Sequence, residues 1–133
     1  MTKTASRPPL AALLSVGFAI WLGFTVIVRL VGQWVFVPDQ PLITILVFAV
    51  FIPVQFYLVR LLLDVFKVEP RQRLWAATWM LLLPLLLDGP SIALAGLLFP
   101  NLSAEAALLY GGLLLTLYAV GFWSALTYSS DRP

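Results

Sequence analysis

Four long apolar stretches make up most of the chain, and short polar or proline-containing segments separate them. A membrane-spanning α-helix needs about 20 mostly apolar residues, and each stretch is long enough. The pattern predicts an all-α membrane protein with one domain over residues 1–133. We expect its four helices at about 10–36, 41–66, 74–99 and 104–128.

The three connecting segments are short. Such connections make helices that follow one another in sequence antiparallel, so the fold class is a four-helix antiparallel transmembrane bundle. The last connector, residues 100–103, reads as a turn. Ser103 is placed to cap the fourth helix, and Glu105 is favourable in its first turn.

Composition strengthens the membrane assignment. Hydrophobic residues make up 62% of the chain and charged residues 11%, whereas soluble domains have about 45–50% and about 25%. The chain has no Cys and no His, which removes the usual metal ligands and several catalytic groups. We therefore expect no enzyme activity and no cofactor. A net charge of +2 is too small for nucleic-acid binding.

Basic residues gather on one side of the predicted membrane. Cytoplasmic segments usually carry the excess of Lys and Arg, so we expect both termini in the cytoplasm. Four of these residues form a predicted basic inner rim, which either attracts anionic lipid headgroups or only sets the topology. The rim consists of Arg60, Lys67, Arg71 and Arg73, and Lys3, Arg7 and Arg132 lie on the same side.

Small residues recur every four positions along the first helix. In lipid, helices associate through close contacts between small residues, and positions four apart share a helix face. The stripe predicts either packing inside the bundle, which we favour, or a docking face for another subunit. Its members are Ala11, Ser15, Ala19 and Gly23.

Three polar side chains fall inside the spans: Arg29, Gln55 and Asp88. A charge at the membrane centre costs at least about 2.5–3.5 kcal/mol, so such residues need partners. At about 1.5 Å per residue, Arg29 and Asp88 both lie in the outer half of the membrane. We expect an Arg29–Asp88 ion pair, with snorkelling of Arg29 to headgroups as the alternative. Gln55 is expected in the inner half, bonded to another helix.

Asp88 lies between Pro84 and Pro90 and is followed by Gly89. Each proline removes a helical hydrogen bond, so we expect the third helix to be kinked or broken near Asp88. Broken helices that carry a carboxylate occur at ion and substrate sites in transporters. The alternative, which we favour, is a proline kink that only shapes the bundle.

Three short motifs resemble a small bacterial membrane-protein family that is known only as a domain of unknown function. They are Arg29-Leu30-Val31-Gly32-Gln33 with Phe36 and Pro38, Leu87-Asp88, and Leu98-Phe99-Pro100-Asn101-Leu102-Ser103. The chain departs from the family's typical C-terminal pattern, because residues 106–113 lack its acidic position. The resemblance implies a four-helix inner-membrane protein and implies no activity.

Two functions therefore compete. The first is a structural or accessory membrane protein that acts through helix–helix or lipid contacts, with a membrane-protein partner or as a homo-oligomer. The second is a small transporter or channel component that uses an intramembrane site at Asp88 and Arg29. A dry Asp88 that is bonded to Arg29, with no pocket beside it, would remove the basis for transport.

Overall fold

A computed structural model describes residues 8–130 of the chain, and four long helices account for most of them. They are α1 (Leu10–Val35), α2 (Pro41–Val65), α3 (Arg73–Ala93) and α5 (Ala104–Ser130). A short 3₁₀ helix, η1 (Pro70–Gln72), precedes α3, and a single turn, α4 (Ala95–Leu98), follows it. All four long helices are long and apolar enough to cross a membrane. The predicted all-α protein with four spans is confirmed.

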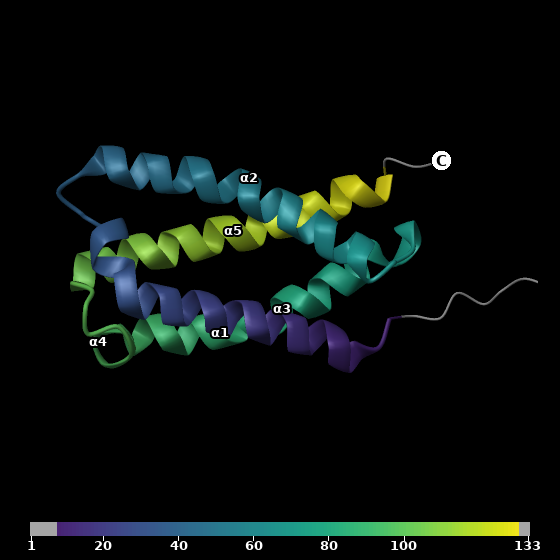
Figure 1. Cartoon of the computed structure of the whole chain (residues 1–133), viewed down its shortest axis with the longest axis horizontal. Helices are drawn as coiled ribbons and strands as arrows, with labels where there is room; N and C mark the ends of the chain where they lie inside the picture. The colour runs from purple at the N-terminus through teal and green to yellow at the C-terminus, as the bar shows by residue number, and fades with distance from the viewer. Residues whose placement is uncertain (1–7, 131–133) are drawn as a thin grey trace, which may run out of the picture.

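Successive long helices run in opposite directions along the bundle (Figure 1). The closest packing, however, is not between neighbours in sequence: α1 packs on α3, α3 on α5, and α5 on α2. The α1–α2 pair touches only sparsely, although five residues join the two helices. The order around the bundle is therefore α1, α3, α5, α2, with its loosest side between α1 and α2.

Local hydrogen bonds determine the start of α5 and the end of α2. Ser103 Oγ accepts a hydrogen bond from the Ala106 N–H at 3.1 Å, which confirms the predicted cap. At the end of α2, the Val68 N–H bonds to the Leu63 carbonyl at 2.9 Å, and Lys67 has φ of 51°. This is a Schellman ending with lysine where glycine is usual. We call the end of the bundle that carries residues 66–72 the basic end.

The third helix was expected to be kinked or broken near Asp88, and it is not broken there. Helix α3 continues through Pro84 and Asp88 to Ala93, and the interruption comes at Leu94, which has φ of −102° and ψ of 25°. A proline within a helix removes only one backbone hydrogen bond, so the turns on either side keep theirs. A bend near Asp88 stays a prediction.

The core consists of two clusters of buried side chains. One lies toward the basic end and is built around Leu13, Leu63 and Met80. The other lies toward the opposite end and is built around Phe99 and Tyr110, with aromatic contacts to Phe24 and Phe36. We call them the basic-end cluster and the aromatic cluster.

Helix α1 packs closely against α3 at Gly17. A Cβ atom on Gly17 would lie 2.1 Å from the backbone oxygen of Met80 and 3.0 Å from its carbonyl carbon. Pro84, four residues after Met80, has no N–H to donate to that oxygen, so the usual helical bond is missing there. Glycine thus lets α1 pack directly over the backbone that the proline leaves without a donor.

Replacing Gly17 with Ala should destabilise the protein by about 1–3 kcal/mol, as is typical of overpacking, because backbone atoms cannot move aside cheaply. The matched control is Gly23→Ala, since no atom lies within 4 Å of a Cβ built there. Thermal unfolding in detergent should show a lower Tm for Gly17→Ala and none of that loss for Gly23→Ala. Equal Tm values for the two variants would contradict the close α1–α3 contact.

Candidate functional site

A cavity lies inside the bundle, and all four long helices contribute to its wall. Its volume is about 90 Å³, and its lining includes residues of both core clusters. A single water needs roughly 10–15 Å³ on such a scale, so the cavity has room for more than one water-sized group. Its wall is mostly apolar, and the polar side chains on it are Trp21, Gln55, Asp88 and Tyr118.

The Asp88 carboxylate is the polar centre of this cavity. The residue is only 5% exposed, and both of its oxygens accept hydrogen bonds from other helices. Trp21 of α1 donates from Nε1 to Oδ1 at 2.8 Å, and the Tyr118 hydroxyl of α5 donates to Oδ2. A buried carboxylate without such bonds would cost several kcal/mol. These two bonds therefore join three helices and satisfy part of the acid's hydrogen-bonding capacity.

No basic side chain lines the cavity. In the described part of the chain, an ion pair joins the side chains of Arg73 and Asp64 at 3.4 Å. It lies at the basic end, away from the cavity. Within residues 8–130, no group of three or more His, Cys, Asp or Glu could hold a metal ion. The arrangement is a carboxylate with neutral donors in an apolar cavity, which suits proton exchange or the binding of a ligand that supplies its own donor.

The model of a family of unknown function, DUF5367, matches residues 35–132, which is most of the chain. The chain belongs to the DUF5367 family. The resemblance to a four-helix family of unknown function is therefore confirmed. The match covers α2 to α5, including Asp88 and Tyr118, and leaves Trp21 outside. No curated protein and no solved structure matches the chain.

The expected Arg29–Asp88 pair is wrong for this DUF5367 protein. Arg29 is exposed, and its guanidinium donates to the carbonyl of Leu98 at the end of α4. It lies eight residues beyond Trp21, a rise of about 12 Å along α1, and the Trp21 indole reaches Asp88 instead. Nearby, Asn101 donates to the Val28 carbonyl at 3.0 Å. Arg29 and Asn101 thus attach α1 to the turn before α5.

Gln55 lies closer to Asp88 than expected. Both residues line the same cavity, although depth along the helices had predicted opposite halves of the membrane. Within residues 8–130, the structure gives the Gln55 side-chain amide no hydrogen-bond partner. The predicted bond from Gln55 to another helix is therefore absent from the described residues, and the amide remains available at the cavity wall.

The small-residue stripe does not pack inside the bundle, so the favoured interpretation of it is wrong. All four members are exposed: Ala11, Ser15, Ala19 and Gly23. The side of α1 that faces α3 carries other buried residues, among them Leu13 and Gly17. A docking face outside the bundle is the interpretation that remains.

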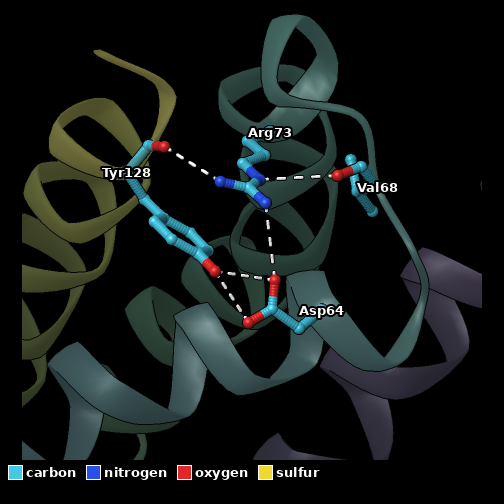
Figure 2. A network of polar contacts seen from close by, with 4 residues as sticks. All are labelled: Asp64, Val68, Arg73 and Tyr128. Atoms are coloured by element: carbon cyan, nitrogen blue, oxygen red, sulfur yellow. Dashed lines mark hydrogen bonds and ion pairs between the residues drawn. The ribbon is translucent and has the colours of Figure 1, made fainter. Parts of the chain in front are cut away.

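The basic inner rim is only partly free to meet headgroups. Figure 2 shows Arg73 enclosed by Asp64, Val68 and Tyr128. Arg73 is 4% exposed, donates to the Tyr128 carbonyl at 3.0 Å, and stacks on the Tyr128 ring with its guanidinium carbon 3.7 Å from the centroid. It holds the end of α5 against the α2–α3 connector, which is a structural role.

The other rim residues differ in exposure. Arg60 is half-buried and donates to the Thr127 hydroxyl at 3.0 Å, whereas Lys67 and Arg71 are exposed. Lys3, Arg7 and Arg132 lie outside the described residues. A surface that attracts anionic lipids would therefore depend on Lys67 and Arg71 rather than on all four members.

Sequence reasoning missed Trp21 and Tyr118, the two partners of Asp88. Each lies near the middle of its helix, far from the membrane interfaces where Trp and Tyr usually settle. A buried indole N–H or phenol O–H needs a hydrogen-bond partner. Two such donors at mid-membrane, together with one deep carboxylate, were the signal that could have predicted these bonds.

Proposed function

We propose that the protein is a non-catalytic membrane protein that binds a small, mostly apolar molecule beside Asp88, as a small transporter or channel component. One observation carries this proposal: Asp88 is buried at a cavity inside the membrane-spanning bundle and has no basic partner on the cavity wall. Ligand sites are typically apolar cavities with a few well-placed polar groups. An Asp88 bonded to Arg29 with no cavity beside it would have removed the basis for transport. Asp88 is instead bonded to Trp21 and Tyr118, and a cavity lies beside it.

A purely structural role for Asp88 explains its two hydrogen bonds but not the space beside it. Protein interiors are close-packed, and an empty cavity costs about 24 cal/mol per Å³. The space of about 90 Å³ beside Asp88 departs from such close packing. Larger side chains on the wall would remove that cost, so the open space favours a ligand.

Carboxylates inside membranes commonly serve as proton relays, so the simplest cargo to test is the proton. In proteoliposomes with an imposed pH gradient, the gradient should decay faster with the wild type than with Asp88→Asn, because the amide cannot release a proton. Asp39→Asn is the matched control, since Asp39 is an exposed acid in the α1–α2 turn and does not line the cavity. A folded Asp88→Asn variant that conducts like the wild type, or a wild type no faster than protein-free liposomes, would contradict proton transport through Asp88.

The second candidate is an accessory role through contact with another membrane helix, here a second copy of this chain. The exposure of all four stripe residues favours it, because small residues let helices approach closely in lipid. Native mass spectrometry from a gentle detergent should then show a dimer that Gly23→Leu abolishes. Gly112→Leu is the control, since space is equally open around Gly112 on α5. A strictly monomeric wild type would count against this role.

The same proposal includes the location: a bacterial inner membrane, with the basic end and both termini in the cytoplasm. The exposed Lys67 and Arg71 at the basic end support it, whereas the α1–α2 turn carries Asp39 and no basic residue.

The chain has no cysteine, so single cysteines can report this orientation without background labelling. A membrane-impermeant maleimide added to intact cells should label Asp39→Cys, and it should label Arg71→Cys only after permeabilisation. Both positions are exposed. The reverse labelling pattern would overturn the topology.

A further inference from the structure

The two hydrogen-bond donors that face Asp88 are already used. The indole N–H of Trp21 and the hydroxyl of Tyr118 both point to Asp88, one to each oxygen. A carboxylate offers about four lone-pair positions, so capacity for further donors remains. The Gln55 amide adds an acceptor oxygen and an NH2 donor on the same wall. Asp88 itself therefore has acceptor positions to spare, and a ligand that binds the carboxylate has to bring donors of its own.

The charge at the site also lacks a counterpart. Trp21 and Tyr118 are neutral, and no Lys or Arg lines the cavity. The nearest candidate by sequence, Arg29, is exposed and donates to the Leu98 carbonyl. An ionised carboxylate in an apolar interior is strongly disfavoured unless a cation or a proton accompanies it. A cationic ligand would supply both the missing charge and the missing donors.

The walls match an organic cation better than a metal ion. A hard metal ion such as Ca²⁺ takes about 6–8 oxygen ligands, whereas the side chains here offer Asp88 and Gln55 in an otherwise apolar lining. Three aromatic side chains, Trp21, Phe24 and Tyr118, also line the cavity. Aromatic faces attract ammonium groups through their π electrons, especially where water is excluded.

The volume limits the size of this cation. An apolar cavity of about 150 Å³ accommodates benzene, and the cavity here has about 90 Å³. The buried part of the ligand is thus smaller than an aromatic ring, which fits an ammonium group and a few methylenes.

We propose that the cavity binds a protonated alkylamine, with its ammonium group at Asp88 and its alkyl chain against the apolar wall. This inference rests on the proposed ligand-binding function and adds the chemical class of the ligand. The ammonium donates to the Asp88 oxygens alongside Trp21 and Tyr118, and no covalent step is involved.

Three probes of matched shape and different charge test it: n-butylammonium, 1-butanol and butyrate. The readout is the indole ¹H–¹⁵N resonance of Trp21 in the detergent-solubilised full chain, assigned by comparison with Trp21→Phe. Butylammonium should shift this resonance saturably and bind more tightly than butanol, and butyrate should not compete. Asp88→Asn should weaken butylammonium binding by about 10- to 100-fold, because the hydrogen bond from the ammonium loses its charged acceptor. Asp39→Asn, which alters an exposed acid that does not line the cavity, should leave it unchanged.

The outcomes separate the two proposals. Equal or tighter binding of butanol, or undiminished binding of butylammonium to Asp88→Asn, would contradict the proposed cationic ligand. The proposed ligand-binding function would stand. No saturable binding of any probe would overturn both. The comparison of the three probes on the unmodified protein decides the question even where Asp88→Asn does not fold.

Discussion

A carboxylate inside a lipid bilayer has to be enclosed by protein, and the Asp88 carboxylate brings three of the four spans together. Trp21 from α1 and Tyr118 from α5 reach it on α3. These two bonds set the rotation of α1 and α5 about their axes at mid-membrane, since turning either helix would withdraw its donor. Hydrophobic attraction between helices is weak in lipid, so polar contacts of this kind are strong determinants of how spans assemble.

The rest of the bundle follows from what surrounds that centre. Toward the basic end, the absence of a side chain at Gly17 lets α1 lie directly on α3 at Met80. Arg73 closes the same end by bonding α5 to the connector before α3. At the opposite end the aromatic cluster around Tyr110 fills the interior. The cavity remains between these packed regions, and all four long helices line it.

Membership in DUF5367 agrees with the four apolar helices and brings no activity with it. The functional argument therefore depends on the site alone. An acid with neutral partners, surplus acceptors and adjacent space differs from a structural ion pair, in which both charges are satisfied within the protein. Arg73 with Asp64 is an example of the latter in the same chain, because Asp64 also accepts a hydrogen bond from the Tyr128 hydroxyl.

The sequence alone determined the number of spans, their approximate limits, the Ser103 cap and the single deep acid. These features depend on local hydropathy and on the backbone's need for internal hydrogen bonds in lipid. Only the tertiary structure decided which helix faces meet. In a membrane helix, the lipid-facing and core-facing positions are both apolar, so hydropathy does not distinguish them. Small residues occupy two faces of α1. Only the structure shows that the face with Gly17 packs on α3, whereas the stripe that contains Gly23 is exposed. Depth along the helices likewise predicted Arg29 as the partner of Asp88. Depth does not say how a helix is rotated about its axis, and the side chains that face Asp88 are Trp21 and Tyr118.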